Sequence, residues 1–225
     1  MHALTLLTLA VGQESVQTSQ TVWRFLVSGG YIMIPLAVCS IAVLALSMDR
    51  YMRLTRQSIL PNGIDDAIEL LRKGEFAKAL TASRDLDAPA GRILAAGIQR
   101  RELDLEHIER AMEDQGQREF EKLRGNIRPL SLIASIAPLL GLLGTVMGIQ
   151  ESFAMVVEAG MGKAENFAGG IEEALVTTIA GLSVAIPALL LASHFNTRLR
   201  LLMIEADEKL TPALELLSQR DTKAA

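Results

Sequence analysis

The sequence is poor in cysteine, histidine and aromatic residues, and these shortages exclude several classes of protein. Cys39 is the only cysteine among 225 residues, so the chain forms no internal disulfide and no cysteine-cluster metal site. His2, His107 and His194 are too scattered to predict a histidine metal centre. A formal net charge of −4 argues against a nucleic-acid-binding protein. We therefore expect no metal, no cofactor and no nucleic-acid partner.

Charged residues are missing from three long stretches, and this absence predicts the fold class. The runs are Phe25–Met48 (24 residues), Pro129–Gln150 (22 residues) and Ala174–Thr197 (24 residues). As helices they would reach about 33 to 36 Å, enough to cross a hydrocarbon core of about 30 Å. Half of all residues are hydrophobic, which fits contact with membrane lipid. The sequence predicts an all-α membrane protein with three transmembrane helices and long helices that extend into the cytoplasm.

The positive charges predict the orientation in the membrane. Of the 22 Lys and Arg residues, 15 lie between the first and second runs, and positive residues are retained on the cytoplasmic side. The N-terminus is therefore predicted to be periplasmic and the C-terminus cytoplasmic. The predicted segments are 1–24 (periplasmic), 25–48 (first transmembrane helix), 49–128 (cytoplasmic helical region), 129–157 (second transmembrane helix), 158–169 (periplasmic loop), 170–197 (third transmembrane helix) and 198–225 (cytoplasmic C-terminal helix).

Residues 1–12 are apolar but too short to span the membrane, and two interpretations stay open. The segment can be an interfacial helix on the outer face, which we favour. It can also be a signal peptide with a small-residue cleavage site at Ala10–Gly12, although it carries no Lys or Arg.

The cytoplasmic region predicts a small helical bundle followed by one long helix. Asn62 is placed to begin a short helix that ends at Gly74, and Pro89 is placed to open another. A single helix is expected over 104–157, bent at Pro129 and Pro138.

Small residues recur at helical spacing on the second and third spans. Two interpretations stay open: close packing of helices in lipid, or the lining of a central space. Thr145 and Thr178 share these faces. Glu173, near the start of the third span, is either an acid at a helix N-terminus or part of an ion route. The small faces consist of Ala134, Gly141, Thr145, Gly148 and Ser152 on the second span, and of Ala174, Thr178, Gly181, Ala185, Ala188 and Ala192 on the third.

Two motifs resemble the signature spans of the MotA/TolQ/ExbB proton-channel family. They are GLLGTVMGI at 141–149 and GGIEEALVTTIAGLSVAIPALL at 169–190. The segment 29–54 also resembles that family's first span. Three spans fit the ExbB/TolQ branch, because the MotA branch has four.

The resemblance implies a bacterial inner-membrane proton channel and not an enzyme. Proteins of this kind form a homopentamer around ExbD/TolR-like partners, whose single membrane helix carries an essential aspartate. Proton flow then drives work on the envelope through a TonB- or TolA-like protein. By resemblance, Thr145, Thr178 and Glu173 form the ion pathway. The further pore-lining residues are Gly141, Gly148, Ser152, Ala174, Thr177, Gly181 and Ala185.

Several positions depart from the family pattern and bear on the choice of ion. Glu172 and Thr177 stand where small residues are usual, and Met147 stands where tryptophan is common. Protons remain the expected ion, with sodium the alternative. A non-conducting scaffold that anchors a single-span partner is the rival hypothesis. Loss of function on removing the hydroxyls of Thr145 and Thr178 would separate the two.

Overall fold

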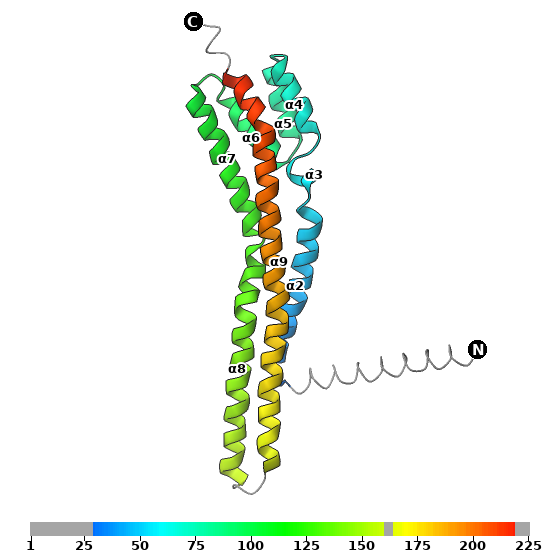
Figure 1. Cartoon of the computed structure of the whole chain (residues 1–225), viewed down its shortest axis with the longest axis vertical. Coiled ribbons are helices and arrows are strands. Elements are labelled where there is room, and N and C mark those ends of the chain that lie inside the picture. The colour runs from blue at the N-terminus through cyan, green and yellow to red at the C-terminus, as the bar shows by residue number, and fades with distance from the viewer. Residues whose placement is uncertain (1–28, 160–163, 219–225) are drawn as a thin grey trace, which may run out of the picture. The chain divides into compact units, whose positions relative to one another are not determined.

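The computed structural model describes residues 29–159 and 164–218, and within these ranges the protein is helical and has no strand (Figure 1). The predicted all-α class is confirmed. The helices are α2 (Met33–Arg53), α3 (Arg56–Ile59), α4 (Gly63–Arg72), α5 (Phe76–Asp85), α6 (Pro89–Gln99), α7 (Leu105–Gly125), α8 (Arg128–Ala159) and α9 (Ala164–Ser218). The predicted N-terminal interfacial helix lies outside the described residues.

Among the described residues, three helical segments each contain a window of 18 residues that is apolar enough to cross a membrane, as predicted. These segments are Met33–Arg53, Leu105–Met155 and Gly169–Ser218. The first span was predicted to start at residue 25, but α2 begins only at Met33. Residues 29–32 form a turn, in which Gly30 has a φ of +59°. A left-handed conformation of this kind favours glycine and does not belong to a continuous helix.

The long helix predicted over 104–157 is interrupted at residues 126 and 127. Pro129 has no N–H group with which to bond the carbonyl of Gly125, and its ring would clash with that carbonyl. The chain tightens there, because Asn126 N bonds Leu123 O at 3.2 Å and Ile127 N bonds Arg124 O at 2.9 Å. Pro138, by contrast, lies inside α8.

The third span and the C-terminal helix are one continuous helix, α9, of 55 residues. No glycine or proline occurs between Pro187 and Pro212, so no residue there favours an end to the helix. The helix also begins at Ala164, within the loop that was predicted over 158–169. Residues 219–225 of the predicted C-terminal helix lie outside the described residues.

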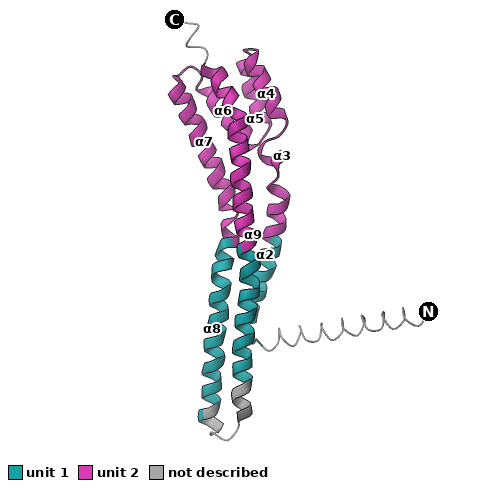
Figure 2. Ribbon diagram, in the orientation of Figure 1, with its two compact units in different colours: residues 1–45, 131–189 teal, residues 46–130, 190–225 magenta. Residues whose placement is uncertain are grey.

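The chain divides into two compact units, 1–45 with 131–189 and 46–130 with 190–225 (Figure 2). The first unit contains the beginning of α2, most of α8 and the first part of α9. Its small core includes Ala137, Ala180 and Ala185, together with Met33 and Leu36.

Large apolar side chains cover the outside of this first unit. On α8, Leu139 and Val146 are exposed, and on α9 Ile179 and Ile186 are exposed. Soluble monomers rarely expose continuous apolar surface of this extent. The arrangement suits helices whose outer faces meet lipid or other membrane helices.

The second unit is a helical bundle in which α4 packs on α5, α5 on α6, and α6 on α7. The later part of α9 belongs to the same unit, where Arg198 Nε donates to Leu54 O at 2.9 Å. A Cβ on Gly97 of α6 would lie 3.3 Å from Leu217 of α9. The bundle of short helices and the opening of α6 at Pro89 agree with the sequence-based expectation.

Candidate functional site

Glycines bring the backbones of α8 and α9 into close contact. A Cβ on Gly141 would lie 2.9 Å from the carbonyl oxygen of Thr177 and 3.1 Å from the Cα of Thr178. A Cβ on Gly181 would lie 2.6 Å from the carbonyl oxygen of Ala137. Because the obstructing atoms are backbone, they cannot move aside as a side chain would. The small faces of the two spans therefore meet each other within one chain, as in other closely packed membrane helices.

The hydroxyl groups of Thr145 and Thr178 meet across this contact. The two oxygens are hydrogen-bonded to each other. Thr145 Oγ1 also lies 3.1 Å from the carbonyl oxygen of Ala174 and 3.2 Å from that of Gly141. Thr178 Oγ1 lies 3.3 Å from the same Gly141 oxygen. Each hydroxyl donates one proton and has two lone pairs, so the half-buried pair retains capacity to accept a hydrogen bond from another group.

Thr177, the neighbour of Thr178, is enclosed between the helices. Its side chain is 1% exposed, and its hydroxyl donates to Ala174 O at 2.9 Å. It fills the space beside Gly144, where a Cβ would lie 2.5 Å from Thr177 Oγ1. The hydroxyl that was unusual in the motif is thus satisfied inside the contact between α8 and α9.

The other small residues expected near the pore lie in the same helix contact. Ser152 donates to Gly148 O at 3.0 Å, and a Cβ on Gly148 would lie 2.8 Å from the carbonyl oxygen of Gly170. Close packing of α8 on α9 within one chain therefore explains why these residues are small. Gly170 was missed in the sequence, although it continues the four-residue spacing of Ala174 and Thr178. The buried members of the set are Gly141, Gly148, Ser152, Ala174, Thr177, Gly181 and Ala185.

Glu173 faces a different neighbour from the two threonines. Its half-buried carboxylate lies against Gly30, in the turn that precedes α2. Carboxylates are favoured near a helix N-terminus, where N–H groups lack partners. No hydrogen bond or ion pair links Glu173 to Thr145 or Thr178 in the described part of the chain. The structure thus brings the threonines together and places Glu173 apart from them.

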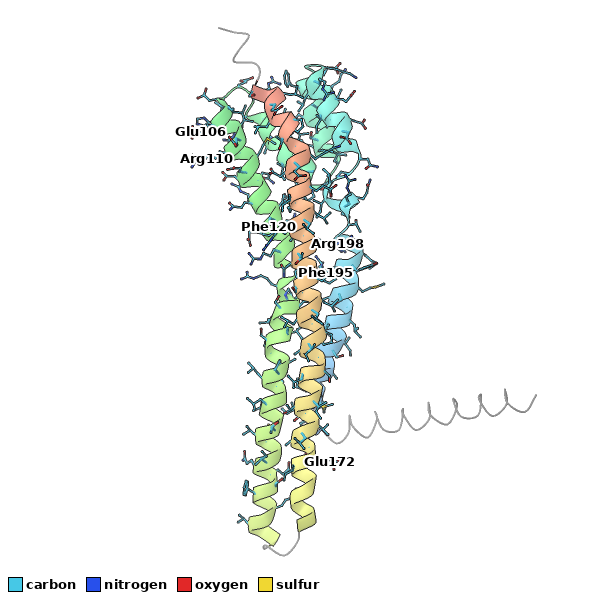
Figure 3. The ribbon with its side chains drawn as sticks, viewed as in Figure 1. Glu106, Arg110, Phe120, Glu172, Phe195 and Arg198 are labelled. Atoms are coloured by element: carbon cyan, nitrogen blue, oxygen red, sulfur yellow. The ribbon has the colours of Figure 1, made fainter. Side chains whose placement is uncertain are left out.

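Glu172 is exposed, and Figure 3 shows it on the side of α9 away from α8. Within residues 29–159 and 164–218, no group of three or more His, Cys, Asp or Glu residues is arranged to bind a metal ion. The polar groups of the contact are hydroxyls and backbone carbonyls, which form hydrogen bonds but carry no charge.

Comparison with known proteins gives consistent matches. The model of the MotA/TolQ/ExbB proton channel family matches residues 85–208. An ExbB-like protein of Synechocystis sp. is 36% identical over 186 residues, which cover 77% of this chain and 70% of that protein. The Tol-Pal system protein TolQ of Pseudomonas aeruginosa is 37% identical over 99 residues, 44% of this chain and 43% of TolQ. The biopolymer transport protein ExbB of Xanthomonas campestris pv. campestris is 36% identical over 91 residues, 40% and 36% of the two chains.

Proposed function

The chain belongs to the MotA/TolQ/ExbB proton channel family, and we propose that it is the channel subunit of a motor that couples proton entry to work on the cell envelope. Membership of the ExbB/TolQ branch makes it a membrane protein of a transport family. The proposed assembly is a homopentamer in the bacterial inner membrane. It surrounds the single membrane helix of an ExbD/TolR-like partner and acts on a TonB- or TolA-like protein.

The hydroxyl pair between α8 and α9 is the observation that supports this proposal most directly. A carboxylate on a partner helix would be very unfavourable in hydrocarbon unless it found polar partners. A protonated carboxyl group can donate to the lone pairs of Thr145 or Thr178. After it loses the proton, the carboxylate can accept from a threonine hydroxyl that turns away from its carbonyl. Both protonation states would then have a hydrogen-bond partner at the same point.

The small residues have a supporting role in this proposal. Because they hold α8 and α9 backbone to backbone, the two threonines stay within hydrogen-bonding distance. Glu173 would act at the periplasmic side, where its contact with Gly30 links the third span to the start of the first. We propose protons as the transported ion, with sodium as the alternative to be tested.

A non-conducting scaffold is the second candidate, and one observation favours it. The two hydroxyl protons already have acceptors in the partner threonine and in the backbone carbonyl of Gly141 or Ala174, so they are satisfied without an ion or a partner. In that case the threonines would serve packing alone, and an anchored partner would not depend on their hydroxyl groups.

Substitution of both threonines distinguishes the channel from the scaffold. The complex with its co-purifying partner is reconstituted in vesicles, and proton uptake is followed with a pH-sensitive dye under an imposed potential. We expect the double substitution Thr145→Ala with Thr178→Ala to lower the proton flux by about tenfold or more, because a charged group in the pore loses one or two hydrogen bonds. Thr145→Ser with Thr178→Ser is the matched control and should retain most of the flux.

Two further readouts complete the experiment. The intact mass of each complex must stay the same, so that loss of flux is not loss of assembly. A sodium gradient without a pH gradient tests the other ion. If the double alanine variant conducts as well as the unmodified complex, the threonines are packing residues and the proposed ion path is wrong. If the unmodified complex itself conducts no ions, the scaffold is correct.

A further inference from the structure

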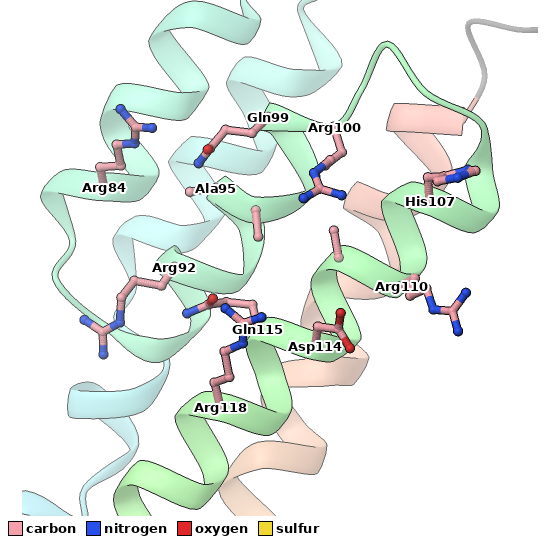
Figure 4. Close-up of a pocket in the computed structure, with 12 residues that line it drawn as sticks. Arg84, Arg92, Ala95, Gln99, Arg100, His107, Arg110, Asp114, Gln115 and Arg118 are labelled. Carbon is pink, nitrogen blue, oxygen red and sulfur yellow. The ribbon is translucent and has the colours of Figure 1, made fainter.

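The second unit contains a hollow of about 400 Å³ that is lined by side chains of α5, α6 and α7 (Figure 4). Arginines dominate its lining. Arg84 comes from α5, Arg100 follows the end of α6, and Arg110 and Arg118 come from α7. We call these four residues and the hollow between them the arginine pocket. Asp114 is the one acidic residue in the lining.

Arg92 also lines the hollow but its charge is already neutralised. Its Nε and Nη2 donate to the two carboxylate oxygens of Glu119, both at 2.8 Å, and its Nη1 lies 2.9 Å from Asp87 Oδ1. The side chain of Glu119 is 7% exposed, so this pair belongs to the structural core of the bundle.

The four guanidinium groups of the arginine pocket have no such neutralisation. None of them forms an ion pair or a hydrogen bond with any other residue that the structure describes, in contrast to Arg92. All four side chains are exposed, so water and salt screen their mutual repulsion in the free protein. The hollow nevertheless gathers four unpaired cations with a single carboxylate in its lining, and an anionic ligand would supply the missing counter-charge.

The shape and chemistry of the lining indicate the kind of anion. The volume lies within the range of about 300 to 1,000 Å³ that is typical of small-molecule sites. Guanidinium groups bind phosphate oxygens with two parallel hydrogen bonds. Gln99 adds an amide group for orientation, and Ala95 and Ala96 give an apolar wall for an organic group. The amide of Gln115 is already engaged, because its Nε2 donates to Glu119 Oε1 at 3.0 Å. We propose that the arginine pocket binds a small organic phosphate that carries two or more negative charges.

Binding is measured by isothermal titration calorimetry on the full chain in detergent, with pyrophosphate and adenosine diphosphate as probes. We expect saturable binding of one probe molecule per chain, weakened by added NaCl because the attraction is between charges. Arg110→Gln with Arg118→Gln should weaken binding at least tenfold, since it removes two charged hydrogen-bond donors. Arg100→Gln is a second, independent variant with the same expected direction.

Arg72→Gln is the matched control, because it removes one exposed arginine of the same unit from α4, outside the pocket. It should leave the affinity unchanged. The proposal is wrong if neither probe binds, or if Arg72→Gln weakens binding as much as the pocket variants do. It is also wrong if the pocket variants change only the mass of the oligomer, since the arginines would then contact another copy of the chain. Circular dichroism of each variant verifies that the helices are intact.

Discussion

At the scale of single residues, glycine determines how closely the two membrane helices approach. The atoms that oppose Gly181 are the carbonyl oxygen of Ala137 and the backbone of Gly141, at 2.6 to 3.2 Å from the position of an added Cβ. Gly169 lies on the same helix, α9, but a Cβ there would meet nothing within 4 Å. The two positions therefore separate the effect of contact from the effect of helix propensity.

Gly181→Ala should destabilise the protein by about 1 to 3 kcal/mol, because the new methyl group forces the backbones of α8 and α9 apart. Gly169→Ala should be neutral or stabilising by up to about 1 kcal/mol, since alanine favours the helix and has free space. Thermal unfolding in detergent, followed by circular dichroism, measures the difference. Equal melting temperatures for the two variants would mean that α8 and α9 do not pack as described.

At the scale of elements, the pair between Arg92 and Glu119 links α6 to α7. The hydrogen bonds and charge of the Arg92 guanidinium lower the pKa of Glu119 below its usual value of 4.5. The same pairing raises the pKa of Arg92. A carboxyl group whose pKa is lower in the folded state stabilises the fold above the pKa of the unfolded chain. That stabilisation is lost as the pH falls through the pKa of the folded state.

Glu119→Gln should therefore lower stability by about 1 to 2 kcal/mol at pH 7, because the half-buried guanidinium group of Arg92 loses its charged partner. The difference in stability between this variant and the unmodified protein should decrease as the pH falls below 4.5 and Glu119 takes up a proton. Melting curves across this pH range test the expectation. Glu121→Gln is the control, since Glu121 pairs with Arg124 on the surface of α7, where such pairs contribute little. If the difference in stability between Glu119→Gln and the unmodified protein does not depend on pH, the charged pair of Arg92 and Glu119 is not its source.

At the scale of the whole molecule, the unequal distribution of Lys and Arg predicts which ends of the spans face the cytoplasm. Tyr31, in the turn before α2, is 86% exposed. The side chain of Glu102, between α6 and α7, is 79% exposed. Residue 31 is expected on the periplasmic side and residue 102 on the cytoplasmic side.

Single cysteines at these positions, in a Cys39→Ser background, test the orientation. A membrane-impermeant maleimide applied to intact spheroplasts should label Tyr31→Cys. It should label Glu102→Cys only after lysis, because the predicted cytoplasmic region is then accessible. Labelling of denatured protein is the control for thiol reactivity. The reverse pattern would show that the chain is inserted with the opposite orientation.

The fold class and the three spans could be predicted from the amino-acid sequence alone, because a helix that crosses lipid needs about 20 consecutive residues without charge, and such a run can be read locally. The paired motifs also identified the family. Helix ends were predicted less well. Pro129 was expected to bend a helix and instead separates α7 from α8, whereas residues 164–169 continue α9 despite their position in a predicted loop.

Which small residues contact each other could be known only from the way the helices pack. The helical spacing places Thr145 on the small face of one span and Thr178 on the small face of the next, but it does not show whether these faces meet each other or line a pore. Thr177 is enclosed beside Gly144, and Thr145 and Thr178 bond each other. Likewise, no local pattern placed Arg84 and Arg118, which are distant in the sequence and lie on different helices, in the lining of one hollow. Contacts between segments depend on how whole helices pack, and periodicity within one helix carries no information about its neighbour.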